Sequence, residues 1–253
     1  MNDRGSYSRA FITDVPADLN TEIARTFNKI IPKYPEEGVY IYSFMENKML
    51  YAHGWEEVAG ISSDELSMLD VVNFTAPQYA PFVEEVNDKA LQFLHERNQR
   101  LTEYSFTIEI KITHKDGLEL PIHARVSVHD VNDDGTLASI MGQFHVNRSL
   151  RFGKVMRYRA YGPEKEAFEN ALDSELFKSL VISPKELEAL HLAAKKGYGY
   201  KQIAAELNVS QSAIEKRIYP MFERFGVVSL GHLINFAHEN YLFDSFHDYH
   251  HSS

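Results

Sequence analysis

The sequence predicts an α+β protein in which an antiparallel-sheet domain is followed by an all-α domain of four helices. Runs of alternating apolar and polar residues, separated by turn residues, predict five strands between residues 36 and 147. Four segments with their own helix-start and helix-stop residues fill residues 182–243. A chain of 253 residues is long enough for two domains of this kind, each with its own core.

The strands of the first domain, placed at residues 36–147, are marked by composition and by turns. Residues 38–44 and 48–54 are rich in Tyr and Ile and form a predicted hairpin. Residues 103–113, 120–131 and 138–146 follow one another across a Lys-Asp-Gly turn and an Asn-Asp-Asp-Gly turn. Because sequential strands joined by tight turns pair antiparallel, we expect one antiparallel sheet.

Helices are predicted between the second and third strands. Ser62 and Glu65 have the spacing of a capping box, so a short helix is expected to start there. A longer helix is expected after Pro81, because five apolar residues recur at helical spacing in that segment. They are Val83, Val86, Ala90, Leu91 and Leu94.

Residues 1–35 are predicted to be a helical lead, in which Asn20 caps one helix. Its apolar stripe is Ile23, Phe27, Ile30 and Ile31, and two prolines follow.

Residues 148–181 form a predicted connector with two different halves. The first half, Arg148–Arg159, carries five basic residues and no acid, which is typical of a solvated connector or of a segment that adds phosphate contacts. In the second half, apolar residues recur every four positions at Phe168, Leu172, Leu176 and Leu180. This stripe either forms a dimer seam or packs on the sheet of its own chain.

The last domain, residues 182–243, opens with a strong helix-start signal. Ser183 is followed by Pro184 and, three residues on, by Glu186; this helix is expected to stop at Gly197. The next three helices are predicted at residues 200–207, 211–225 and 230–241, and residues 244–253 are a predicted tail.

The second and third helices of this domain are joined by the tight turn Asn208-Val209-Ser210, which makes a helix-turn-helix. An α-helix fills the major groove of DNA, and its unpaired N-terminal amides attract phosphate. Inside the third helix, Pro220 deletes a backbone hydrogen bond at a cost of about 3 kcal/mol. We therefore expect the regular groove-facing segment of this helix to end near Tyr219, with a kink before Met221–Phe225 returns to the core.

The segment ISPKELEALHLAAKKGYGYKQIAAELNVSQSAIEKRIYPMFERFGVVSLGHLINFAHENYLF resembles the LuxR/FixJ-type helix-turn-helix of bacterial transcription regulators over roughly 60 residues. Residues 36–147 are similar to a PAS sensor domain in the order of their elements and in the Lys-Asp-Gly hairpin. The resemblance implies a one-component regulator in which a PAS-like domain senses a signal and the last domain binds double-stranded DNA.

This resemblance also implies roles for individual residues. Lys201 and Ser210 match positions that touch phosphate, and we add Gln211, Arg217 and Arg224 to the phosphate set. On the groove-facing side of the third helix lie Ser212, Ala213, Ile214, Glu215, Lys216 and Tyr219. Of these, Ser212, Glu215, Lys216 and Tyr219 are the predicted base-facing set. Glu215 could accept from cytosine and Lys216 could donate to guanine. Ala213, Glu215, Arg217 and Pro220 depart from the residues common in the family.

Charge is distributed unevenly along the chain. The net charge is −10, but residues 183–241 hold seven Lys and Arg against six Glu, a net of +1, which leaves −11 elsewhere. Only this last quarter would not repel a polyanion. With so few cations, one copy should bind DNA weakly, so we expect a homodimer.

Several classes of protein are disfavoured. The chain has no cysteine, which excludes disulfides and thiolate chemistry, and no apolar run approaches the roughly 20 residues that span a bilayer. The N-terminus lacks the apolar segment of a signal peptide, so we expect a cytoplasmic protein without membrane attachment. No phosphate loop, paired-acid cleft or metal motif appears, so we expect neither catalysis nor a metal site.

The sensor domain is expected either to enclose a small apolar pocket or to be a filled core that only dimerises. Candidate pocket residues are Phe44, Tyr51, Trp55, Val71, Phe74 and Phe82. The cofactor is not specified by the sequence. A small molecule is one option, and haem with His95 as axial ligand is a less favoured one. His123, His129 and His145 lie on predicted strands, where solvent-face side chains are the favoured interpretation over a metal or pH site.

Two other functions remain open. One is a protein-interaction adaptor that keeps the helix-turn-helix fold without reading DNA, which Ala213, Pro220 and the acidic net charge would suit. The other is a small-molecule-binding or catalytic α+β domain with a helical appendage.

Overall fold

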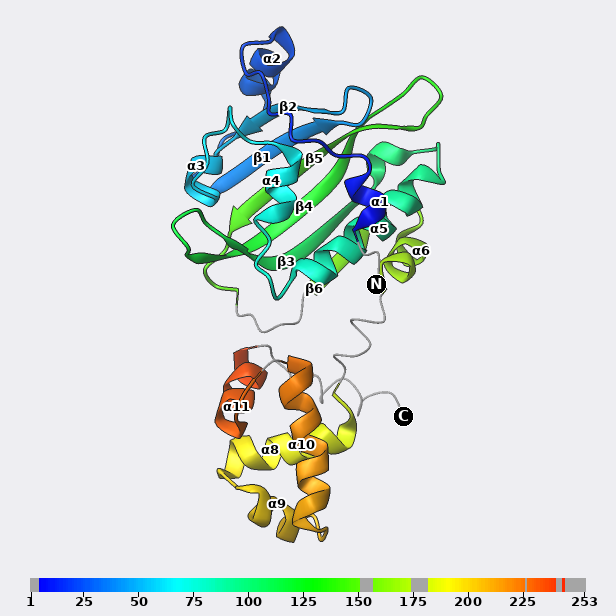
Figure 1. Ribbon diagram of the computed structural model, residues 1–253. Helices are drawn as coiled ribbons and strands as arrows, with labels where there is room; N and C mark the ends of the chain where they lie inside the picture. The colour runs from blue at the N-terminus through cyan, green and yellow to red at the C-terminus, as the bar shows by residue number, and fades with distance from the viewer. Residues whose placement is uncertain (1–4, 151–156, 174–181, 226, 240–242, 244–253) are drawn as a thin grey trace. The chain divides into compact units, whose positions relative to one another are not determined.

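The computed structural model describes residues 5–150, 157–173, 182–225, 227–239 and 243. They fall into two compact units, hereafter the sheet unit (5–150 with 157–173) and the helical unit (182–225, 227–239 and 243). One unit is built on a sheet and the other is all helical, so the chain is α+β, as the sequence predicts (Figure 1). The predicted tail at 244–253 lies outside the described residues.

A single antiparallel sheet organises the first unit. Its strands follow the spatial order β2-β1-β5-β4-β3-β6. They are β1 (Glu37–Ser43), β2 (Lys48–His53), β3 (Ser105–Thr113), β4 (Glu119–Val131), β5 (Leu137–Val146) and β6 (Arg157–Tyr161). The five predicted strands are confirmed. Burial alternates along part of β3 and of β5, as expected for a strand with one buried side, whereas β1 is buried at six consecutive positions and so on both faces.

The sixth strand, β6, was not predicted, and it corrects the expectation for this segment. The basic run Arg148–Arg159 was expected to be a connector, yet residues 157–161 pair with β3 from Glu109↔Arg157 to Ser105↔Tyr161. Ala160 is completely buried in this strand. Charged side chains suit an edge strand because they discourage further pairing, so the charge that suggested a connector is compatible with an edge. Residues 151–156 lie outside the described part of the chain.

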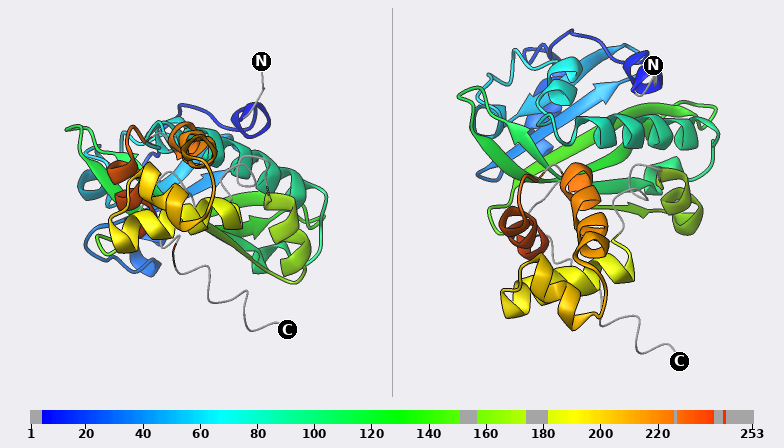
Figure 2. Two further views of the ribbon diagram at one scale, coloured as in Figure 1. Left: turned by 90° about the horizontal axis from the view of Figure 1, so that it is seen from below. Right: turned by 60° about the horizontal axis from the view of Figure 1, so that its bottom comes forward.

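Helices α3 (Trp55–Val58), α4 (Met68–Asn73) and α5 (Ala80–His95) cover one face of the sheet (Figure 2). The predicted stripe of α5 is buried as expected. The short helix expected at Ser62 is wrong. The Ser62 hydroxyl donates to Asp64 instead, and the capping box that starts α4 is made by Ser67 and Asp70.

Two short helices precede the sheet. A four-residue helix, α1 (Ser6–Arg9), was not predicted, because so short a segment has no periodicity to read. Helix α2 (Glu22–Ile30) is capped by Thr21, whose Oγ1 accepts from the Ala24 amide at 3.1 Å, and not by Asn20. Both residues are good caps, so the sequence alone left the choice between neighbours open.

The buried side of α2 also differs from the prediction. Ala24 packs with Ile41 and Tyr51, on the face of the sheet opposite to α5, because Ile41 alternates with the inward-facing Tyr40. Ile23 and Ile30, predicted to be inward, are 50% and 65% exposed.

Helix α6 (Lys165–Leu172) belongs to the sheet unit. Phe168 stacks on Phe93 of α5 with ring centroids 4.5 Å apart, and both Phe168 and Leu172 are completely buried. The first half of the predicted stripe therefore packs within its own chain and is not exposed as a dimer seam. Leu176 and Leu180 lie outside the described residues.

The helical unit contains α8 (Pro184–Lys196), α9 (Tyr200–Glu206), α10 (Gln211–Phe225) and α11 (Leu230–Glu239). Ser183 and Glu186 form the predicted capping box, and Gly197 ends α8 in the left-handed conformation at φ 66°. Helix α10 is continuous through Pro220 to Phe225, and Met221 and Phe225 are buried in the core as expected. Among the described residues, no helix is long and apolar enough to cross a bilayer.

Candidate nucleic-acid interface and sensor cavity

Helices α9 and α10 form the predicted helix-turn-helix. Asn208 takes the left-handed conformation at φ 54°, which this residue type tolerates, and Ser210 caps α10 by accepting from the Ala213 amide at 3.2 Å. Ile203 and Ala204 of α9 are buried. The small Ala204 side chain lets the two helices cross closely, so the turn and the packing together fix the orientation of α10.

One face of α10 is buried and the opposite face is open to solvent. Four residues at helical spacing are buried in the helical unit: Ile214, Ile218, Met221 and Phe225. Ile214 is completely buried, so its assignment to the groove-facing side is wrong. The i, i+3, i+4, i+7 repeat that buries it turns the residues between these positions outward.

Most of the predicted base-facing set lies on the open face. Ser212, Lys216 and Tyr219 are exposed, and Tyr219 is 50% exposed, with Tyr200 of α9 at its edge, 5.8 Å between ring centroids. Glu215 is half-buried and accepts a hydrogen bond from the Gln211 Nε2 at 2.8 Å. Gln211, which was assigned to phosphate, thus fixes the Glu215 carboxylate.

The predicted phosphate contacts are distributed between two environments. Lys201 is exposed in the first turn of α9, and Ser210 is exposed in the turn between α9 and α10. Arg224 instead binds Glu186 of α8 through both Nη atoms, at 3.0 and 3.2 Å, and the Arg217 Nη1 lies 3.7 Å from Glu188. The structure turns these two arginines toward acids of their own unit, so they do not contribute free cations to the open face.

The Glu186–Arg224 pair makes the stability of the helical unit pH-dependent. Burial alone would raise the pKa of Glu186, but hydrogen bonds from Arg224 and Ser183 outweigh burial and hold the pKa below its usual range. A carboxyl with a depressed folded pKa contributes stability above its unfolded pKa of about 4.3, and this contribution is lost as pH falls through the folded pKa.

We expect the helical unit to lose about 1 kcal/mol of unfolding free energy between pH 6 and pH 3 through Glu186, a figure reduced for partial solvent exposure. Glu186→Gln should remove this part of the pH dependence. The measurement is urea unfolding followed by far-UV circular dichroism. Glu188→Gln is the control. Because the Glu188–Arg217 pair is longer and more exposed, this variant should keep the pH dependence of the wild type. If the unfolding free energy of the two variants depended on pH in the same way, the prediction would be contradicted.

A cavity of about 80 Å³ lies inside the sheet unit, between the sheet and helices α4 and α5. Volume on the order of 10–15 Å³ accommodates one water, so several water-sized groups fit. Its walls are mostly apolar, and no charged side chain lines it among the described residues. Hydrogen-bonding side chains on the wall are Ser8, Tyr40, Thr75 and Asn87.

The sequence identified only part of this cavity. Phe44 and Val71 line it, whereas Tyr51 packs against α2 on the other face of the sheet. Trp55 is completely buried with its Nε1 donating to the Val39 carbonyl at 3.0 Å, and Phe74 stacks on Trp55. Trp55 is therefore a core residue, and the half-buried Phe74 packs against it without lining the cavity.

Phe82 is buried on α5 and does not line the cavity either. The haem hypothesis has no geometric support at His95. Its Nδ1 lies 2.9 Å from the Tyr7 hydroxyl in a hydrogen bond, and its ring is not on the cavity wall. Burial lowers the pKa of His95.

Tyr40 is one of the wall residues that were not predicted from the sequence. It is buried, its pKa is raised by burial, and a side chain at the facing Gly142 would meet the Tyr40 ring at 2.1 Å. An isolated glycine inside a strand signals close approach of a neighbour, so Gly142 was the available clue.

The strand histidines lie in the sheet. His123 of β4 is paired with His145 of β5, and the His123 Nδ1 lies 3.9 Å from Glu109. His129 of β4 contacts the ring of Phe27 in α2. Within the described ranges, no group of three or more His, Asp or Glu side chains is arranged to hold a metal ion.

No protein-family model matches the chain, and no curated protein sequence matches it. Among solved structures, a Vibrio cholerae VqmA dimer, described as a LuxR-type receptor, is 13% identical over 87% of this chain and 88% of that one, with a TM-score of 0.34. A phage VqmA in complex with DPO is 15% identical over 85% and 88%, with a TM-score of 0.34. A PAS domain from Colwellia psychrerythraea is 15% identical over 50% and 98%, with a TM-score of 0.37. These structures are of the two kinds, LuxR-type regulator and PAS domain, that the residues resemble.

Proposed function

We propose that this protein is a dimeric transcription regulator that binds double-stranded DNA through α10 and is modulated by the sheet unit. The observation that carries the proposal is the open face of α10, where Ser212, Lys216 and Tyr219 are exposed at i, i+4 and i+7. A helix with three solvent-exposed side chains along one face can enter a major groove and contact base edges.

The surroundings of this face support phosphate binding. Ser210 is exposed at the N-terminus of α10, and a helix N-terminus attracts anions. Lys201 is exposed in the first turn of α9 and adds a cation to the same helix-turn-helix. Because Arg217 and Arg224 are held by Glu188 and Glu186, few cations remain for phosphate. Pairing two copies on adjacent half-sites would double the contacts, which is the physical reason for a homodimer.

The cavity gives the sheet unit a place to receive a signal. A small neutral molecule would fill apolar space and hydrogen-bond to the polar wall residues, and it would shift the populations of states in which the space is open or collapsed. We infer that such a shift, transmitted along residues 162–182, changes the spacing of the two recognition helices in the dimer.

DNA binding is tested by fluorescence anisotropy at several salt concentrations, with fragments selected by the wild-type protein from a random double-stranded pool. Lys216→Ala should weaken binding by about 10- to 100-fold on the preferred fragment and relax its preference at one base pair. Lys201→Ala should weaken binding to all fragments alike, and it should reduce by about one the slope of log affinity against log salt concentration.

Lys48→Ala, in the sheet unit, is the charge-matched control and should bind like the wild type. If the wild type and all three variants bind alike, the proposal that α10 reads DNA is refuted.

The adaptor function remains the second candidate, because the two partnered arginines and the Gln211–Glu215 contact leave the face of α10 poor in free cations. In that case no salt-dependent DNA binding would be seen at all.

A further inference from the structure

An N-terminal segment forms part of the cavity wall. Residues 5–12, which include α1, contribute Ser8 and Ile12 to the lining. Helix α1 has no buried side chain, and a four-residue helix is not stable by itself. The segment must therefore be held in place by contacts that it makes with the rest of the sheet unit.

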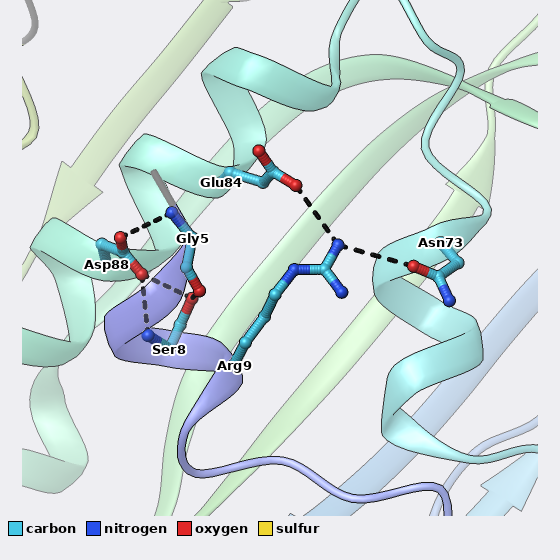
Figure 3. Close-up of polar contacts among 6 residues, drawn as sticks. All are labelled: Gly5, Ser8, Arg9, Asn73, Glu84 and Asp88. Atoms are coloured by element: carbon cyan, nitrogen blue, oxygen red, sulfur yellow. Dashed lines mark hydrogen bonds and ion pairs between the residues drawn. The ribbon is translucent and has the colours of Figure 1, made fainter. Parts of the chain in front are cut away.

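The contacts that hold it are polar and aromatic, and most of them are made with α5. The Tyr7 hydroxyl is hydrogen-bonded to the His95 Nδ1 at 2.9 Å, and the rings of Tyr7 and Phe11 pack edge-on against His95. Both carboxylate oxygens of Asp88 accept backbone hydrogen bonds at 2.7 Å, Oδ2 from the Gly5 amide and Oδ1 from the Ser8 amide. The Ser8 hydroxyl also donates to Oδ1 at 2.7 Å (Figure 3). Charge-assisted bonds of this kind are stronger than neutral ones, so Asp88 is the main tether.

Arg9 makes the second tether. Its Nη2 lies 3.2 Å from the Glu84 carboxylate of α5 and 3.5 Å from the Asn73 side-chain oxygen at the end of α4, so the guanidinium bridges the two helices (Figure 3). The Arg9 side chain is 38% exposed, which makes this tether the weaker of the two.

A second hollow, of about 100 Å³, lies beneath the Arg9 bridge. Arg9, Asn73 and Glu84 line it. It shares three wall residues with the main cavity, Val72, Thr75 and Val83. Val72, Thr75 and Val83 therefore lie between the main cavity and the second hollow, which Arg9 lines.

From these contacts we infer that residues 5–12 are a lid over the cavity, that Asp88 and Arg9 latch it shut, and that a small neutral molecule reaches the cavity by displacing it. The inference rests on the proposed sensor role of the cavity and is independent of DNA binding. Local opening of a short segment that is held by a small set of hydrogen bonds and ring contacts requires much less free energy than global unfolding.

The test uses the full-length chain and 4-fluorobenzyl alcohol as a neutral aromatic probe, with its exchange followed by fluorine NMR. Asp88→Asn should raise the association and dissociation rates of the probe together by about tenfold or more, with its Kd changed less than about twofold. Arg9→Gln should raise both rates about two- to fivefold. Arg100→Gln is the control. It removes a similar surface ion pair, between Arg100 and Glu103, which touches neither the lid nor the cavity. The association and dissociation rates of the probe should therefore match those of the wild type.

Amide hydrogen exchange provides the second readout. Residues 5–12 should exchange faster in Asp88→Asn, while the amides of α5 stay as protected as in the wild type, which shows that the variant folds. If the probe binds with equal rates in all variants, the lid is refuted and the sensor role of the cavity stands. If the probe binds no variant, both the lid and the sensor role are refuted, and the DNA-binding result is unaffected.

Discussion

Phe168→Ala is expected to lower the free energy of unfolding of the sheet unit by about 3–5 kcal/mol, the usual cost of removing a buried phenyl ring. The ring is completely buried, stacks on Phe93 and meets Tyr104 and Phe106 edge-on. Truncation leaves a space that the neighbouring rings cannot close. The free energy lost because the phenyl ring is no longer buried therefore adds to the cost of the cavity that remains.

The measurement is urea unfolding followed by tryptophan fluorescence, because the single tryptophan, Trp55, is buried in the sheet unit and reports on it alone. Tyr34→Ala is the matched control: this aromatic is 62% exposed and should change the unfolding free energy by less than about 0.5 kcal/mol.

A different pattern would restore the dimer-seam hypothesis for this stripe. If Phe168→Ala left the unfolding midpoint of the sheet unit unchanged and instead dissociated a dimer in analytical ultracentrifugation, the ring would be covered by a second copy, contrary to its position here.

Ile214→Asp is expected to unfold the helical unit altogether. The substitution removes a completely buried side chain, at about 2–5 kcal/mol, and places an unpaired carboxylate in an apolar core, at several kcal/mol more. The sum equals or exceeds the roughly 5 kcal/mol by which a small domain is stable. Far-UV circular dichroism should show the loss of helix, while Trp55 fluorescence should still report a folded sheet unit.

Ser212→Asp, two residues earlier on the same helix, is the paired variant that separates fold from function. Ser212 is exposed in the first turn of α10, where a negative charge is favourable to the helix dipole, so the unit should remain folded or become slightly more stable. The same charge would face DNA phosphates and bases, and the affinity for DNA should fall at least about tenfold. Ser212→Asp with unchanged DNA affinity would show that this face of α10 does not meet DNA.

The sequence by itself determined the features that are set by residues close to one another in the chain. The capping box at Ser183, the turn at Asn208 and the cap at Ser210 are each fixed by hydrogen bonds spanning a few residues, and five strands follow from alternation. The resemblance to the LuxR/FixJ-type helix-turn-helix also implied that Ser212, Lys216 and Tyr219 face outward, and all three are exposed.

Only the tertiary structure decided what depends on residues far apart in the chain. It showed that Arg224 meets Glu186, that Phe168 is covered by Phe93, and that the basic residues 157–161 complete a sheet edge. It also placed residues 5–12 over a cavity whose other walls begin some 30 residues later. The sequence around a charged or aromatic residue does not show whether that residue contacts solvent, DNA or another element of the fold. Its partner depends on how elements that are far apart in the chain pack together, and they meet only on folding.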